Sequence, residues 1–159
     1  MNITVLCVGK IKEAYYREAL AEYVKRLSKY CRLNVIEVAD EQTPDKASDT
    51  EVAAILKKEE ERILSKIPAN SHVISLAIEG KSLDSVAFSS LIDDLGISGK
   101  SNICFIIGGS LGLSDNVKSR SDMLLSFSKM TYPHQLMRVI LTEQIYRAYR
   151  IIKGEPYHK

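Results

Sequence analysis

Three closely spaced glycines follow an apolar stretch in the segment FIIGGSLGLSDNVKSRS, residues 105–121. Gly108, Gly109 and Gly112 allow the backbone to turn tightly or to approach another molecule without a Cβ in the way. Phosphates and dinucleotides are the usual ligands of such loops, but neither the G-x-G-x-x-G spacing nor a closing G-K-[ST] is present. The spacing therefore indicates either a backbone that approaches some other ligand or a simple strand-to-loop turn.

A second set of chemically capable residues ends the chain in the segment EPYHK. Tyr157 can stack on a base or donate a hydrogen bond, and His158 can be neutral near pH 7. A neutral imidazole can accept a proton, whereas a cationic one can only stabilise an anion. Gly154 supplies a hinge and Pro156 stiffens the approach to Tyr157. The segment is either a frayed terminus or a flap that a partner orders.

Basic residues gather near the same end of the chain. The whole chain carries a net charge of +2, but residues 117–159 hold eight Lys or Arg against three acidic residues, a net +5. Arg147, Arg150 and Lys153 are central to this surplus. Such asymmetry indicates an anionic partner, with solvated side chains on helix faces as the equal alternative.

Regular elements must position these residues, and their pattern is clear. Short apolar runs rich in β-branched residues, typical of strands buried on both faces, cover 3–8, 33–38, 72–78, 102–107 and 123–128. Helical patterns cover 13–29, 51–67 and 83–95, with Gly96 ending the third, and the polar segment after the glycines is a further short helix. Pro133 begins a last helix that runs to about residue 152.

This alternation predicts one α/β domain over residues 1–159, with a mostly parallel sheet and helices on both faces. Ligands of such sheets bind beyond the carboxyl ends of the strands, which places three late loops, AIEGKSL, GGSLGLS and SKMTYPHQ, at the site. Simple topology rules favour an open, unknotted sheet. The last helix is apolar on several sides, so either a second chain covers it or it is central within one subunit.

Several classes of protein are excluded by composition. No apolar run approaches the ~18 residues of a membrane span, and the N-terminus MNITVLCVGK lacks the basic region of a signal peptide. Three cysteines without a C-x-x-C pair indicate reduced thiols and a cytoplasmic protein. No His, Cys, Asp or Glu grouping has metal-ligand spacing, so we expect no metal.

Three motifs in order, IIGGSLG, LSFSKMTYPHQLMRVILTEQIYRAYRI and EPYHK, give the chain a resemblance to a known family. It resembles the ribosomal RNA large subunit methyltransferase H group of the SPOUT superfamily over essentially its whole length. The resemblance implies an S-adenosylmethionine-dependent enzyme that methylates N3 of a pseudouridine in helix 69 of 23S ribosomal RNA, within the ribosome. It also implies a C-terminal trefoil knot, against the topology rules above, and a homodimer with the cofactor at its interface.

The resemblance further implies roles for individual residues. The cofactor would lie against Leu76, Gly108, Phe127, Ser128, Lys129, Met130, Thr131 and Tyr132. His158, Tyr157 and Arg147 would act on the acceptor, with His158 the candidate base and Arg147 facing phosphates or uracil carbonyls. Without the resemblance, Leu76 reads as a core leucine and Arg147 as a solvated helix residue.

Two further functions compete with the methyltransferase. One is a nucleotide-binding regulatory module with a flavodoxin-like sheet, which binding of a flavin or nucleotide would support. The other is a ribosome-associated protein without catalysis, which would bind RNA through its basic C-terminal stretch regardless of S-adenosylmethionine. Calorimetry with the cofactor discriminates among all three.

Overall fold

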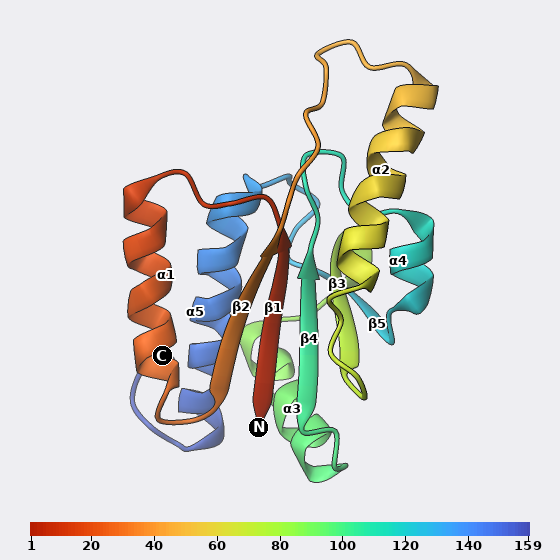
Figure 1. Ribbon diagram of the computed structural model, residues 1–159. Coiled ribbons are helices and arrows are strands. Elements are labelled where there is room, and N and C mark those ends of the chain that lie inside the picture. The colour runs from red at the N-terminus through yellow and green to blue at the C-terminus, as the bar shows by residue number, and fades with distance from the viewer.

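A computed structural model describes residues 1–159 as five strands alternating with five helices (Figure 1). In chain order the elements are β1 (Asn2–Val8), α1 (Ala14–Leu27), β2 (Arg32–Val38), α2 (Asp49–Leu64), β3 (His72–Ser82), α3 (Ser85–Ile97), β4 (Asn102–Ile107), α4 (Asp115–Arg120), β5 (Met123–Ser126) and α5 (His134–Ile152). The predicted alternation is confirmed.

The strands form one sheet in the order β2-β1-β4-β3-β5, and every neighbouring pair is parallel. The central strands β1 and β4 are almost continuously buried, because helices cover both faces of the sheet. The parallel α/β sheet predicted from the apolar runs is therefore confirmed.

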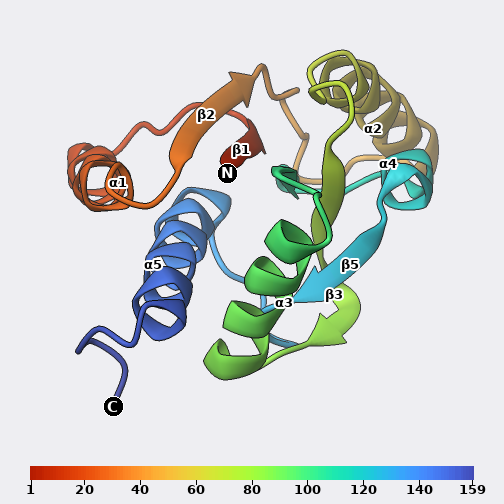
Figure 2. The same cartoon turned by 90° about the horizontal axis from the view of Figure 1, so that it is seen from below.

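Helices α1, α3 and α5 cover one face of the sheet, and α2 and α4 cover the other (Figure 2). The larger core cluster packs the first face around side chains such as Val5, Phe105 and Leu141. The smaller one packs Leu6, Ile106 and neighbouring side chains against the second face. Since α5 lies between α1 and α3, its apolar sides are largely covered within one chain, as the central-helix interpretation expected.

Strand β3 is longer than the predicted 72–78, because a bulge lets it continue beyond an apparent loop. Its pairing with β5 shifts between Leu76 and Lys81, both of which lie opposite Leu125. The residues between them leave the ladder, and a Cβ on Gly80 would lie 2.6 Å from the Leu124 carbonyl carbon. The glycine that marked a loop in the sequence instead permits close contact between two strands.

Helix α3 runs past Gly96, which was wrongly predicted to end it. The left-handed residue that follows the helix is Gly99, with φ of +79°. Gly96 sits inside the last turn, where a Cβ would approach Cε of Met1 at 2.9 Å. Helix α2 begins two residues earlier than predicted, because Ser48 and Glu51 form a capping box.

Candidate functional site

A cavity of about 390 Å³ lies where the loops after β3, β4 and β5 meet, at the carboxyl ends of these strands. Seven of the eight residues predicted to contact a cofactor line it together: Leu76, Gly108, Phe127, Ser128, Met130, Thr131 and Tyr132. The eighth, Lys129, is exposed and lies outside the lining. Three segments that are distant in sequence thus converge on one hollow, as their position after parallel strands predicted.

The glycine loop forms one wall of the cavity by folding against itself. Gly112 has φ of +78° and donates its N–H to the carbonyl of Gly109 at 3.1 Å. A Cβ on Gly108 would lie 2.5 Å from the Gly112 oxygen. Gly108 is therefore required first by the shape of the loop itself, because any side chain there would displace the Gly112 backbone.

The bulge in β3 forms a second wall with Ala77, Ile78 and Glu79. The Glu79 carboxylate forms an ion pair with Lys118 Nζ at 2.5 Å, and this contact lowers the pKa of Glu79. The acidic residue beside the cavity is thus already paired with a cation on α4. The sequence placed the loop AIEGKSL at the site but did not indicate this ion pair.

The segment after β5 closes the remaining side and is held by its own polar contacts. Ser128 accepts the N–H of Met130 on its hydroxyl at 2.9 Å, and Ser126 donates to the Ser128 carbonyl at 3.2 Å. Phe127 packs edge-on against Phe88 of α3. Met130 is nevertheless 74% exposed, so an apolar edge of the cavity faces outward.

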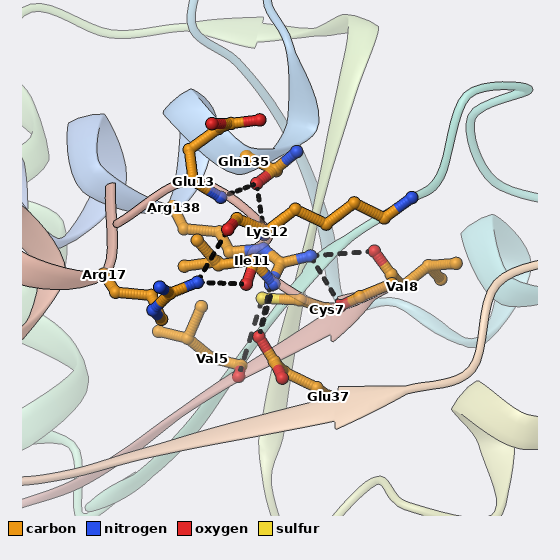
Figure 3. Close-up of polar contacts among 11 residues, drawn as sticks. Val5, Cys7, Val8, Ile11, Lys12, Glu13, Arg17, Glu37, Gln135 and Arg138 are labelled. Carbon is orange, nitrogen blue, oxygen red and sulfur yellow. Dashed lines mark hydrogen bonds and ion pairs between the residues drawn. The ribbon is translucent and has the colours of Figure 1, made fainter. Parts of the chain in front are cut away.

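Behind the cavity, a fully buried cation fixes the start of α5 (Figure 3). Arg138 donates to the carbonyls of Val8 at 2.9 Å and Gly9 at 2.7 Å, and it pairs with Glu37 at 2.7 Å. The preceding residue, Met137, lines the cavity. Arg138 therefore ties the cavity's helical edge to the ends of β1 and β2, a role that sequence reasoning missed.

Two neighbouring side chains strengthen this attachment. Gln135 accepts the Lys12 N–H on its amide oxygen at 2.8 Å, which links the start of α5 to the approach to α1. His134 lines the cavity, and burial together with the charge of Arg138 lowers its pKa. A neutral His134 at physiological pH is consistent with the apolar character of the cavity.

Helix α2 supports the glycine loop from the other side. Glu60 accepts the amide N–H of Asn116 at 3.0 Å, and its hydrogen bond with Ser114 heads the contacts that lower its pKa. Glu59 accepts the Glu41 N–H at 3.0 Å, and burial raises its pKa. Glu59 and Glu60 are buried although they belong to the charged run KKEEER.

The three residues predicted to act on the acceptor lie together at the carboxyl end of α5. Arg147 donates to Glu143 Oε1 from Nε at 3.1 Å and from Nη2 at 2.6 Å, and its guanidinium lies over the Tyr157 ring at 4.7 Å. Tyr157 donates to the same carboxylate oxygen at 3.0 Å. Nη1 of Arg147 lies 3.3 Å from Nδ1 of His158. We refer to these four residues as the tail cluster.

The terminal segment makes defined contacts within its own chain, where the sequence left open a frayed terminus or a flap that a partner orders. Arg150 donates to the carbonyl of Pro156 at 2.9 Å, and Gly154 makes the turn after α5 with φ of +62°. Burial, followed by hydrogen bonds with Tyr23 and Glu143, raises the pKa of Tyr157. The Tyr157 hydroxyl therefore stays protonated at neutral pH and acts as a donor.

The loops that line the cavity meet the start of α5, and the C-terminal segment with Tyr157 and His158 follows its other end (Figure 1). Met137 lines the cavity and Arg147 belongs to the tail cluster, a separation of about 15 Å along the helix at 1.5 Å per residue. One chain therefore does not place its own tail beside its own cavity.

Four of the eight basic residues in 117–159 form ion pairs within the chain. Lys118, Arg138, Arg147 and Arg150 each bind a carboxylate of the same chain. The surplus that suggested an anionic partner is thus carried outward by four exposed residues, Arg120, Lys129, Lys153 and Lys159. Arg138 in particular is wholly buried and unavailable to any partner.

No group of three or more His, Cys, Asp or Glu side chains is arranged to hold a metal ion. No helix has both the length and the apolar character needed to cross a membrane. All three cysteines are free and buried, and burial raises the pKa of Cys7 and of Cys104 to about 12 in each case. These thiols are structural.

Comparison with known proteins gives a consistent result over the whole chain. A family model described as a predicted SPOUT methyltransferase matches residues 1–158. Proteins named ribosomal RNA large subunit methyltransferase H from Clostridium acetobutylicum and Clostridium tetani are 59% and 60% identical over 159 residues, covering all of both chains.

Among solved structures, one described as a probable methyltransferase from Bordetella pertussis aligns with a TM-score of 0.57 at 11% identity. The alignment covers 92% of this chain and 95% of that one, and at such low identity it shows a shared fold alone. The family model and the two curated relatives go further: the chain belongs to the SPOUT methyltransferase family and, within it, to the ribosomal RNA large subunit methyltransferase H group.

Proposed function

We propose that this protein is an S-adenosylmethionine-dependent methyltransferase that acts in the cytoplasm on N3 of a pseudouridine in helix 69 of 23S ribosomal RNA. The observation that carries the proposal is the cavity at the carboxyl ends of β3, β4 and β5, in a chain about 60% identical to proteins named for large-subunit RNA methylation. Resemblance to the methyltransferase H group supports the choice of a pseudouridine in helix 69 as the acceptor.

The cavity suits the cofactor in size and chemistry. Its volume of about 390 Å³ falls within the range of small-molecule sites, roughly 300–1,000 Å³. Apolar side chains such as Leu76 and Phe127 can hold the faces of an adenine, and the backbone of the glycine loop offers N–H and C=O groups to its edge. When bound, S-adenosylmethionine supplies an activated methyl group at a sulfonium centre.

The residues of this chain must then orient the acceptor and manage the proton on N3. Alignment of the two reacting centres is the main requirement, because the leaving group is already good. Tyr157 can donate a hydrogen bond or stack on the base, and Arg147 brings a cation to the same place. Both favour an acceptor that becomes anionic as N3 loses its proton.

We further propose that the active unit is a homodimer in which the tail cluster of one chain meets the cavity of the other. The separation of the two sites along α5 supports this arrangement, as do the exposed apolar residues at the cavity edge, Met130 and Tyr132. Family membership supports a trefoil knot in the C-terminal half. Sedimentation should give twice the chain mass of 17.8 kDa, and a monomer at micromolar concentration would contradict the dimer.

Calorimetry followed by transfer assays tests the function. The protein should bind S-adenosylmethionine and its demethylated product, and should transfer labelled methyl groups to ribosomes lacking the modification. Nuclease mapping should place the label on one pseudouridine of the large-subunit RNA. Absence of cofactor binding would reject the enzyme, and RNA binding that ignores the cofactor would favour a ribosome-associated protein without catalysis.

A further inference from the structure

The contact between Arg147 and His158 constrains the imidazole chemically. A guanidinium carries only donors and keeps its proton in proteins, so it cannot accept a hydrogen bond. Its Nη1 lies 3.3 Å from Nδ1 of His158. That nitrogen must therefore be the acceptor, with its lone pair directed at Arg147. In the neutral imidazole the single proton then resides on Nε2, which faces away from Arg147.

Glu143 holds the Arg147 side chain in the position from which it contacts His158. It receives two hydrogen bonds from Arg147 and one from Tyr157 on a single oxygen, while its other oxygen accepts the Gln144 amide N–H at 2.8 Å. The Arg147 side chain is thus held at Nε and Nη2, which leaves Nη1 to meet the imidazole. The hydrogen bond with Glu143 also raises the pKa of Arg147.

The arrangement belongs to one chain and does not depend on where the tail docks. All four residues of the tail cluster come from α5 and the segment directly after it. When the tail cluster meets the cavity of a second copy, Arg147 and Glu143 accompany His158. The proton of the neutral imidazole therefore stays on Nε2 wherever the tail docks.

We propose that Arg147, held by Glu143, fixes His158 as a hydrogen-bond donor through Nε2, so that His158 stabilises the acceptor base rather than removing its proton. This inference rests on the proposed function and deepens it. His158 would donate to a carbonyl oxygen beside N3, where negative charge accumulates once the N3 proton has left. His158 is the catalytic residue, and Arg147 and Glu143 are positioning residues.

The proton balance of the reaction follows directly. The N3–H bond of the acceptor breaks first, and its proton passes to solvent water. The resulting anion, bound to Nε2–H, then forms the new N–C bond, while the electrons of the broken S–C bond stay on sulfur. No protein base is consumed, and His158 begins and ends the cycle in the same protonation state.

Replacement of His158 by two different residues separates a donor from a base. His158→Gln keeps an N–H group near the position of Nε2 but cannot accept the proton, whereas His158→Ala keeps neither. Under single turnover on saturating ribosomes, His158→Ala should be about 10²–10³-fold slower, the usual effect of losing a donor to a developing oxyanion. His158→Gln should remain within about 10-fold of the parent, because a replacement donor conserves the charge-assisted hydrogen bond. His72→Gln, at the start of β3, is the matched control.

Equal loss in both His158 variants would overturn the donor role. A parent protein that binds no S-adenosylmethionine, or transfers no methyl group, would instead reject the proposed function itself. The two failures are therefore distinguishable in the same set of assays.

Nitrogen NMR of histidine-labelled protein gives a readout without cofactor or RNA. At a pH where His158 is neutral, its Nδ1 should show the shift of a bare acceptor nitrogen and its Nε2 that of a protonated one. Arg147→Ala should convert this signal to a mixture of both tautomers, whereas Lys153→Ala on the exposed helix end should leave it unchanged. An Nδ1–H signal, or a mixture in the parent protein, would contradict the proposal.

Discussion

The cavity and the tail cluster are built from different parts of the same chain and differ in chemical character. The cavity is built from backbone and apolar side chains of three loops, and its only ion pair, between Glu79 and Lys118, is internal. The tail cluster consists of ionisable and aromatic side chains on one helix and a short segment. The first is suited to enclosing a ligand, and the second to handling charge.

This difference shows how ligand binding and charge handling can be divided within one small domain. The cavity is formed by loop backbones that the whole sheet supports, so a single chain contains all of it. A few side chains on the end of a helix need only that helix, so they can be presented to another molecule. The two regions can therefore be damaged separately, and the expected effects differ in size.

The largest effect is expected from separating the regions onto two different chains. Gly108→Val should disrupt the cavity, because its Cβ would meet the Gly112 backbone, and deletion of 156–159 should remove the tail. Each homodimer should lose nearly all transfer. The mixture of the two variants should regain about a quarter of the parent rate, since about half of its dimers are mixed and each of these has one of its two composite sites intact.

A control for this experiment places both changes in the same chain and mixes it with the parent protein. There both composite sites of a mixed dimer carry one defect if cavity and tail come from different chains, as proposed, so the mixed dimers should be inactive; an intact site would remain only if each chain used its own tail. Failure of the first mixture to regain any transfer, with mixed dimers shown to form, would mean that each chain uses its own tail.

A strong effect on the cavity alone is expected from Gly80→Ala. The new Cβ would lie 2.6 Å from the Leu124 backbone, which must move and carry the bulge of β3 with it. We expect a loss of stability of about 1–3 kcal/mol, typical of overpacking, together with weaker cofactor binding. Calorimetry and thermal unfolding measure both.

Gly99→Ala offers the matched comparison, because Gly99 has φ of +79°, open space around it and a position far from the cavity after α3. It should also destabilise the fold, through backbone strain, but leave cofactor affinity intact. If both variants weakened the cofactor equally, general destabilisation would explain the result and the bulge would lose its special role.

A moderate effect confined to the tail cluster is expected from Glu143→Gln. Loss of the carboxylate weakens two hydrogen bonds with Arg147 and one with Tyr157. Methyl transfer should slow by roughly 10-fold, within the range of a hydrogen bond to a charged group. Cofactor affinity should not change, because Glu143 lies outside the cavity, and a weakened affinity would contradict the division between the regions.

The smallest effects concern two adjacent carboxyls behind the glycine loop and should have opposite signs. Burial raises the pKa of Glu59 above its usual 4.5, so its contribution to stability is present below that pH and is lost as the pH rises through the folded-state value. Hydrogen bonds with Ser114 and Asn116 lower the pKa of Glu60, so its contribution is present above pH 4.5 and is lost on acidification.

Thermal unfolding at two pH values tests this pair. Glu59→Gln should stabilise the protein at pH 8 and have little effect at pH 4, whereas Glu60→Gln should destabilise it at pH 8. Shifts of the same sign at pH 8 would show that the two side chains experience similar surroundings.

Much of the fold could be predicted from the sequence because strands buried on both faces leave continuous apolar runs. The alternation of these runs with amphipathic helices sufficed for the parallel sheet, and the sheet placed three loops on one edge. The bulge at Gly80 was not predictable, because its cause is contact with Leu124, a residue 44 positions away. The prediction that Gly96 ends its helix failed for the same reason, because the side chain beside Gly96 is that of Met1, which is distant in sequence.

The site was predictable in part. The sequence did not show which side chains within the chain bind one another there. Arg138 looks like any basic residue of an amphipathic helix, and only the packing of α5 against β1 makes it a buried cation. Glu143 carried a usable signal, since its spacing of four residues before Arg147 favours an ion pair on one helix face. Tyr157 of the tail donates to the same carboxylate, so this helix-face pair is also one of the attachments of the tail.

The attachment made by Arg138 also bears on when the protein can fold. Its two backbone acceptors precede it by about 130 residues, so they wait for nearly the whole chain to be synthesised. Contacts so distant in sequence slow folding, because the chain must close a large loop before they form. The ends of β1 and β2 therefore lack their cation on any nascent chain that has not yet reached α5. The last step in forming this part of the native state is accordingly the packing of α5 onto strands that were synthesised long before it.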